Sequence, residues 1–131
     1  MRMTRKKFDN LQRCARQGGV IAALAMDQRG SLRKMLSGAE GHTISDEQMS
    51  EFKVVVTETL TPYASAVLLD PEFGTEASRS RAEGVGLLAS YERSGYDNTQ
   101  PGRSPDLEPL WSVRRLDEFG ATAVKLLVYY N

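Results

Sequence analysis

Residues 23–32, ALAMDQRGSL, pass from a short apolar segment directly into an acid, an amide and a base. The apolar segment begins at Val20 and reads VIAALAM, with no alternation of apolar and polar positions. Such a run is typical of a parallel strand that is covered on both faces. We therefore predict a first strand over residues 20–27, with Asp27 at its end.

Three further apolar segments predict strands, and segments with helical spacing separate them. The strands are expected at ASAVLLD (64–70), VGLLASYE (85–92) and ATAVKLLVYYN (121–131). Helices are expected at 4–17, 32–36, 45–60 and 110–120, with one or two irregular turns within 72–84. Strands that alternate with helices are typical of a parallel sheet with covering helices, so the sequence predicts the α/β class.

Two of these helices carry detailed signals. Ser45 stands three residues before Gln48, which is the spacing of a capping box at a helix start. Each helix is also expected to bury one apolar face, made of Phe52, Val55, Val56 and Leu60 in the first, and of Leu110, Val113, Leu116 and Phe119 in the second.

Residues 93–109 are rich in Gly, Pro, Ser, Asp and Asn, which predicts a long loop. Loops of this length within a compact domain often serve as lids or binding loops. Disorder is the alternative.

The composition limits the kinds of binding partner and the cellular compartment that we expect for this protein. Seventeen basic residues balance 17 acidic ones, so a small molecule or a protein is favoured over nucleic acid or a membrane surface. Cys14 is the only cysteine and is expected to be a packed thiol in a reducing compartment. The basic start lacks the apolar core of a signal peptide, and no apolar run approaches the ~20 residues of a membrane span. We expect a cytoplasmic protein.

Polar residues stand where the predicted strands end. Asp27, Asp70 and Tyr129 each share a strand face with residues two positions earlier, and Lys125 lies on the same face as Tyr129. Active sites of parallel α/β folds lie at the carboxyl ends of the strands, because the loops converge there. These side chains are therefore the first candidates for a functional site.

Lys125 has several interpretations. Burial lowers the pKa of a lysine, and a neutral amine in an apolar pocket can form a Schiff base or transfer protons. Nearby carboxylates would raise the pKa instead, and the side chain could reach solvent or form a structural ion pair with Asp27. A Mg²⁺ site made by Asp27, Asp70 and Glu92 is a weaker alternative, since their spacing carries no metal signature. We predict no bound metal.

Four blocks of the sequence resemble a known enzyme family in the same order. They are IAALAMDQRGSLRKML (21–36), LTPYASAVLLDPEFG (60–74), GLLASYERSGYD (86–97) and AVKLLVYYN (123–131). These blocks resemble the tagatose 1,6-bisphosphate aldolases, a family of class I ketose-bisphosphate aldolases, and the resemblance extends from about Leu11 to Asn131.

The resemblance implies a (β/α)8 TIM barrel, of which residues 1–131 would form the first half, about four β/α units, truncated after the fourth strand. It implies cleavage of tagatose 1,6-bisphosphate to dihydroxyacetone phosphate and glyceraldehyde 3-phosphate, without a cofactor. Asp27 would assist proton transfer and hold substrate hydroxyls, and Gln28 would shape the substrate site. Lys125 would act near the Schiff base, and substrate contacts are also expected from Asp70 and Tyr129.

The family's Schiff-base lysine and an acid-base glutamate lie on later strands, so the chain alone is expected to be inactive. Half a barrel leaves two unpaired strand edges, and we expect it to self-associate or to pair with a C-terminal half. Two alternatives stay open. One is a non-catalytic half-barrel that binds a sugar phosphate or a partner, and the other is a self-associated form in which Lys125 makes the Schiff base.

Overall fold

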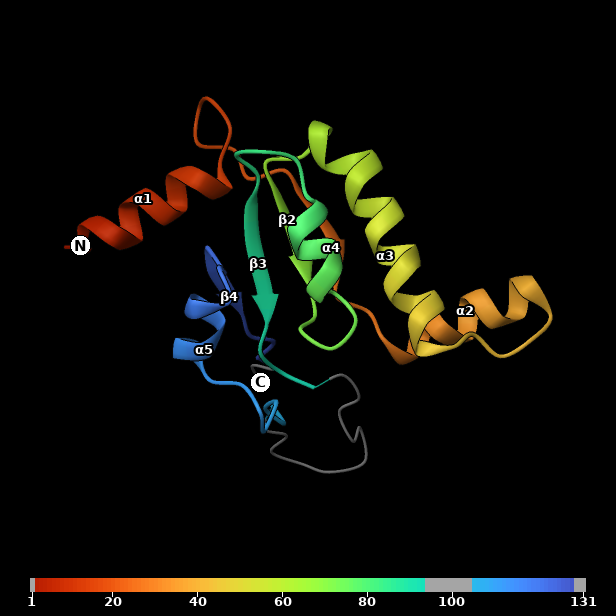
Figure 1. The fold of residues 1–131 in the computed structure, drawn as a ribbon. Helices are drawn as coiled ribbons and strands as arrows, with labels where there is room; N and C mark the ends of the chain where they lie inside the picture. The colour runs from red at the N-terminus through yellow and green to blue at the C-terminus, as the bar shows by residue number, and fades with distance from the viewer. Residues whose placement is uncertain (1, 94–104, 129–131) are drawn as a thin grey trace.

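The computed structural model describes residues 2–93 and 105–128 and folds them around one four-stranded parallel sheet. Each strand is hydrogen-bonded to the next in chain order, with helices between them (Figure 1). This arrangement confirms the predicted fold class, the first four strand units of an α/β barrel. The elements are α1 (Arg5–Cys14), β1 (Ala23–Met26), α2 (Gly30–Glu40), α3 (Asp46–Leu60), the 3₁₀ helix η1 (Thr61–Tyr63), β2 (Ala66–Leu69), α4 (Thr75–Ser80), β3 (Gly86–Ser90), α5 (Val113–Glu118) and β4 (Ala123–Lys125).

Local signals set several helix ends. Ser45 Oγ accepts a hydrogen bond from Gln48 N at 3.2 Å, and Gln48 Oε1 accepts one from Ser45 N at 3.0 Å, so the predicted capping box begins α3. Helix α2 is longer than the predicted 32–36 and ends at Gly41, whose φ of +74° favours glycine. No helix in the described ranges is long and apolar enough to cross a membrane.

The apolar face predicted for α3 is wrong for Val55 and Leu60, although Phe52 packs against the core as expected. Val55 is 60% exposed and Leu60 is 43% exposed, whereas α3 buries Met49, Lys53 and Thr57. The buried face contains a lysine because an acid lies beneath it in the sheet, and the ion pair that they form is described below.

The apolar face predicted around α5 is wrong for Leu110 and Val113, whereas Leu116 and Phe119 pack against the core. The helix begins only at Val113, so Leu110 precedes it and is 73% exposed, and Val113 is exposed as well. Leu116 is fully buried against Ala89 and Ala121. The capping hydroxyl of Ser112, which accepts from Arg115 N, sets the late start of the helix.

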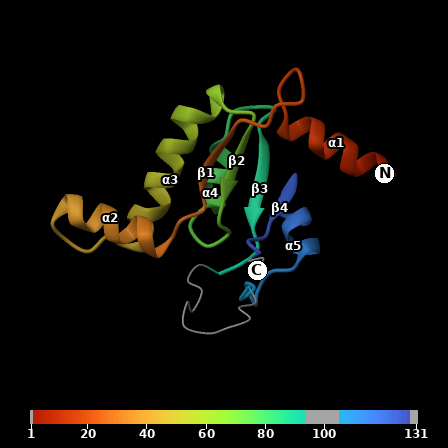
Figure 2. The same ribbon diagram turned by 180° about the vertical axis from the view of Figure 1, so that it is seen from behind.

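The sheet has one covered face, so the expectation that β1 is covered on both faces is wrong. Helices α3 and α4 lie over one side of the strands (Figure 1), and in the opposite view no helix of the described residues lies over β1 (Figure 2). Ala23 and Ala25 are accordingly exposed, while Leu24 and Met26 pack into the core beneath α4. Strand β4 is also shorter than predicted, since it ends at Lys125.

Helix α1 closes the amino ends of the strands. Ser65 Oγ accepts from Ala22 N at 2.8 Å and donates to the Cys14 carbonyl at 2.7 Å, which joins the end of α1 to the starts of β1 and β2. Gly86 begins β3 directly against this junction, where a Cβ atom would lie 2.9 Å from Cys14 Sγ. Burial raises the pKa of the Cys14 thiol, which keeps it protonated and suits the predicted packed role.

A buried ion pair joins α3 to the carboxyl edge of the sheet. Lys53 and Asp70 both have fully buried side chains and form a close ion pair. Lys53 Nζ also donates to the carbonyls of Met26 at 2.8 Å and Gln28 at 2.9 Å. Asp70 Oδ1 accepts from the backbone of the loop that follows β2, including Phe73 N at 2.8 Å. One lysine thus fixes the ends of β1 and β2 together.

We expect Lys53→Met to destabilise the protein by about 3–5 kcal/mol, because it leaves the Asp70 carboxylate buried without its main counterion. The double variant Lys53→Met/Asp70→Asn removes the unpaired charge and is expected to recover part of this loss. Urea unfolding measures both free energies. Glu51→Met, on the exposed side of α3, is the control and should change stability by no more than about 0.5 kcal/mol. A double variant that is no more stable than Lys53→Met would contradict a coupled pair.

We expect Gly74→Ala to destabilise the protein by about 1–3 kcal/mol, because the added methyl group would overpack this position. A Cβ atom there would lie 2.3 Å from the Asp70 carbonyl oxygen and 2.8 Å from Leu69 Cβ. Gly38→Ala is the matched control, since no atom lies within 4 Å of its Cβ position in α2, and it should stabilise the helix by up to about 1 kcal/mol. Thermal unfolding compares the two variants, and equal melting temperatures would contradict the packing argument.

Candidate functional site

Three residues from different strand ends meet at the carboxyl edge of the sheet. Asp27 follows β1, Glu92 lies two residues beyond β3, and Lys125 ends β4. Lys125 Nζ lies 3.0 Å from Asp27 Oδ2 and forms a second, close ion pair with Glu92. We call these three residues the carboxyl-edge cluster. The structure therefore brings together two residues that the sequence predicts, Asp27 and Lys125, and forms the ion pair considered between them.

The electrostatics of the cluster keep Lys125 charged. Burial by itself would lower the pKa of Lys125, but hydrogen bonds and charge from Glu92 and Asp27 outweigh that effect and raise it above its ordinary value. The lysine side chain remains 30% exposed, whereas that of Glu92 is only 4% exposed. The cluster consequently presents a protonated amine at the edge of the sheet, held from below by two carboxylates.

Glu92 makes more contacts in this site than the sequence predicted. Its second carboxylate oxygen accepts from Leu127 N at 3.3 Å, and its carbonyl oxygen accepts from a guanidinium nitrogen of Arg29 at 3.3 Å. Glu92 entered the sequence analysis only as a Mg²⁺ ligand. The signal that could have found it was present, because the third predicted strand ends in this acid.

The other predicted residues lie apart from the cluster. Asp70 is buried against Lys53 and does not reach Lys125, so the three acids considered as a Mg²⁺ site do not form one group. Gln28 is exposed beside Asp27 and uses its carbonyl to accept from Lys53. Tyr129 lies outside the described residues. Within the described ranges, no three His, Cys, Asp or Glu side chains come together as a metal site.

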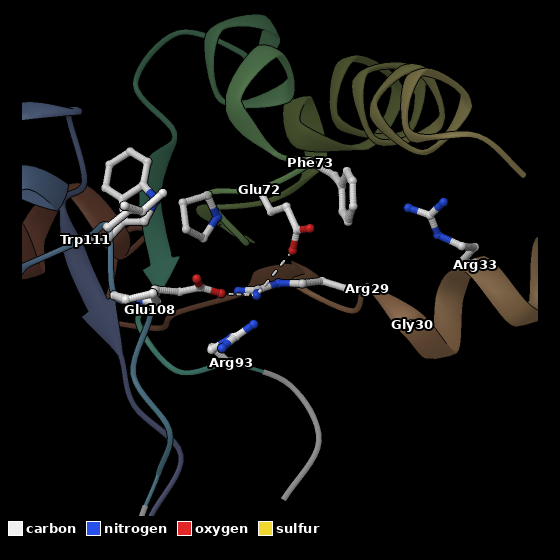
Figure 3. Close-up of a pocket in the computed structure, with 11 residues that line it drawn as sticks. Arg29, Gly30, Arg33, Glu72, Phe73, Arg93, Glu108 and Trp111 are labelled. Carbon is white, nitrogen blue, oxygen red and sulfur yellow. Dashed lines mark hydrogen bonds and ion pairs between the residues drawn. The ribbon is translucent and has the colours of Figure 1, made fainter.

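Beside the cluster, Arg29 occupies the wall of a pocket of about 650 Å³ (Figure 3). Its side chain is 8% exposed and lies 3.5 Å from carboxylate oxygens of both Asp70 and Glu72, with a close ion pair to Glu108. Its Nε atom is buried without a hydrogen-bond acceptor in the described residues. Sequence reasoning missed Arg29, although it belongs to the polar triplet that directly follows β1.

Further arginines and aromatic rings line the same pocket. Arg33 stacks its guanidinium over the Phe73 ring at 5.2 Å, and Arg93 and Trp111 lie on the opposite wall (Figure 3). Part of this wall comes from the predicted loop. Residues 94–104 lie outside the described residues, but the end of the loop returns to the segment just after β3, where Glu108 N donates to the Tyr91 carbonyl at 3.0 Å. The pocket therefore combines positive charge with an apolar wall next to the carboxyl-edge cluster.

Comparison with known proteins identifies the family to which this chain belongs. The family model of the DeoC/LacD family aldolases matches residues 21–131. A protein of Listeria monocytogenes named "Tagatose 1,6-diphosphate aldolase" is 55% identical over 131 residues, which is 100% of this chain and 38% of that protein. "Tagatose 1,6-diphosphate aldolase 2" of Enterococcus faecalis is 50% identical, and the match covers 98% of this chain and 39% of that protein. A relative from Staphylococcus epidermidis is 46% identical, and the match covers 100% of this chain and 40% of that protein. The chain spans about two-fifths of the length of these relatives, and it belongs to the DeoC/LacD family of aldolases.

Proposed function

We propose that this chain supplies part of the active site of a ketose-bisphosphate aldolase that cleaves tagatose 1,6-bisphosphate to dihydroxyacetone phosphate and glyceraldehyde 3-phosphate. The relatives of similar sequence bear the name of this activity. The observation that carries the proposal is the charged Lys125 between Asp27 and Glu92 at the carboxyl edge, where α/β folds of this type place their chemistry.

The reaction breaks the bond between the α carbon and the β carbon, counted from the substrate carbonyl. In the Schiff-base route a neutral lysine forms an imine with that carbonyl and releases water. A base then removes the proton of the hydroxyl on the β carbon, which leaves as an aldehyde, and the electrons of the broken bond move into the protonated imine to give an enamine. The ammonium of Lys125 is a poor nucleophile for the first step, because its pKa is raised. We propose instead that Lys125 stabilises the negative charge that develops on a substrate oxygen. Asp27 would transfer a proton and hold a substrate hydroxyl. The imine-forming lysine then lies outside this 131-residue sequence, which leaves the chain alone inactive.

Substrate recognition is proposed for the neighbouring residues. Gln28 is exposed beside Asp27 and can contact a substrate hydroxyl directly. Asp70 is buried, so its contribution would pass through Arg29, which lies 3.5 Å away. Arg29 and Arg33 line the adjoining pocket with guanidinium groups, which suit the phosphate of a sugar phosphate. Tyr129 remains a predicted substrate contact.

A protein partner is part of this proposal. Strands β1 and β4 form the two edges of the described sheet, and the segment that follows β4 exposes Leu126 and Val128. Exposed apolar residues beside unpaired strand edges favour association. We propose that this surface pairs with further β/α units, either in a C-terminal half or in a second copy of the chain.

Titration of Lys125 tests its proposed charge. Carbon-detected NMR of the lysine side chains should give Lys125 a pKa above the ordinary lysine value, and Glu92→Gln should lower it. Because folding raises this pKa, the stabilisation from the cluster is present at neutral pH and is lost as the pH rises through the raised value. The stability difference between wild type and Lys125→Met should therefore shrink at high pH. Asp117→Asn removes a carboxylate that pairs with Lys6 and is the control. A Lys125 pKa below the ordinary value would remove the basis for the assigned role.

Reductive trapping tests where the Schiff base forms. The folded chain is incubated with dihydroxyacetone phosphate and borohydride at neutral pH, and peptide mass spectrometry follows the lysines, with a full-length class I aldolase as the positive control. We expect no reduced adduct on Lys125, because its amine is protonated. An adduct that appears on Lys125 and is lost in Lys125→Met would show that this lysine forms the imine, and would favour the self-associated alternative.

A further inference from the structure

A second pocket lies at the opposite end of the sheet from the carboxyl-edge cluster. It measures about 430 Å³ and is lined by residues at the starts of β3 and β4 and at the end of α1. Its lining comes from the last turns of α1 and α4, from the turn before β3 and from the loop before β4, and includes Arg13, Arg79, Arg81, Glu83 and Thr122. We call it the amino-end pocket.

Arg81 brings a cation without a counterion to this pocket. Its Nε donates to the Val85 carbonyl at 3.0 Å, and one of its terminal nitrogens donates to the Ser78 carbonyl. No carboxylate in the described ranges forms an ion pair with it. A guanidinium has five N–H donors, so others remain available for a ligand. Partial burial also lowers the pKa of Arg81.

Two further arginines add to the positive charge. Arg13, in the last turn of α1, is exposed and forms no ion pair within the described part of the chain. Arg79, in the last turn of α4, pairs with Glu76 on its own helix. Glu83 is the one acid among the lining residues, so three guanidinium groups face one carboxylate.

The backbone of the turn before β3 suits an anion as well. Val85 N donates to the Ala82 carbonyl at 3.2 Å, and Gly84 adopts a φ of +79°, which forms a tight turn. Within the described residues, the amide groups of Glu83 and Gly84 at the tip of this turn have no hydrogen-bond acceptor. Backbone amides next to guanidinium groups are common components of phosphate sites.

We propose that the amino-end pocket binds a small phosphate-bearing molecule, held by Arg13 and Arg81. The planar guanidinium fork matches the geometry of phosphate oxygens, and the volume falls in the range of small-molecule sites. A nucleic-acid ligand fits less well, because the chain as a whole has a formal net charge of zero. This site is separate from the proposed sugar-phosphate site, which lies beyond the other end of the strands.

Calorimetry and amide NMR with inorganic pyrophosphate test the site. We expect binding that shifts the amide signals of Gly84, Gly120 and Thr122, and that Arg13→Gln weakens by about tenfold through loss of a charge-assisted contact. Arg13→Gln should fold normally, since the Arg13 side chain has no partner among the described residues. Arg5→Gln removes one charge from the same helix, outside the pocket lining, and should leave the affinity unchanged.

Three results would overturn the proposal. The first is an absence of pyrophosphate binding by the folded chain. The second is equal weakening by Arg13→Gln and Arg5→Gln, which would show a general effect of charge. The third is a set of shifts confined to the carboxyl end, around Gly30, that disappears in Arg33→Gln, which would place the anion in the Arg29 pocket. The failure of the aldolase proposal would leave this test unchanged, because Arg13 and Arg5 belong neither to the carboxyl-edge cluster nor to the Arg29 pocket.

Discussion

The buried ion pair between Lys53 and Asp70 is the contact on which the carboxyl edge of the sheet depends. Its lysine reaches from α3 to the ends of β1 and β2 and donates to two carbonyls on either side of Asp27. Asp70 in turn lies near Arg29 and organises the loop beneath the pocket. A buried pair of this kind adds little net stability over apolar packing, but either partner alone would be strongly unfavourable. Its contribution here is positional, because it determines where the backbone of residues 26–28 lies.

Charge alternates along this edge. Lys53 neutralises Asp70, Arg29 lies among Asp70, Glu72 and Glu108, and Lys125 joins Asp27 to Glu92. Each acid is thus opposed by a cation from another segment, which permits several charges to lie close together. Among the cations of this network, Lys125 has the most exposed side chain, at 30%, while those of Lys53 and Arg29 are almost fully buried.

The sequence was sufficient to predict the features that depend on neighbouring residues along the chain or on strand geometry. The capping box of Ser45 and Gln48 is local, and the meeting of Asp27 with Lys125 follows from parallel strands whose carboxyl ends share an edge. The buried face of α3 was not predictable from periodicity, because Lys53 is buried only in the presence of Asp70. The role of Arg29 was missed for a similar reason, since its close partner Glu108 lies 79 residues further along the chain. The face predicted around α5 failed because Ser112 caps the helix after Leu110 and so leaves that leucine outside it.

The span of the carboxyl-edge cluster has a consequence for how the protein is made. Asp27 and Lys125 are 98 positions apart, so their contact is among the most non-local in the described fold. Contacts of high sequence separation form slowly, since a long loop must close before they contribute. On the ribosome, Asp27 and Glu92 emerge well before Lys125. The two carboxylates therefore lack their shared counterion until the fourth strand has been made. Within the described residues, the carboxyl edge is therefore expected to assemble after the core beneath α3 and α4 has already folded.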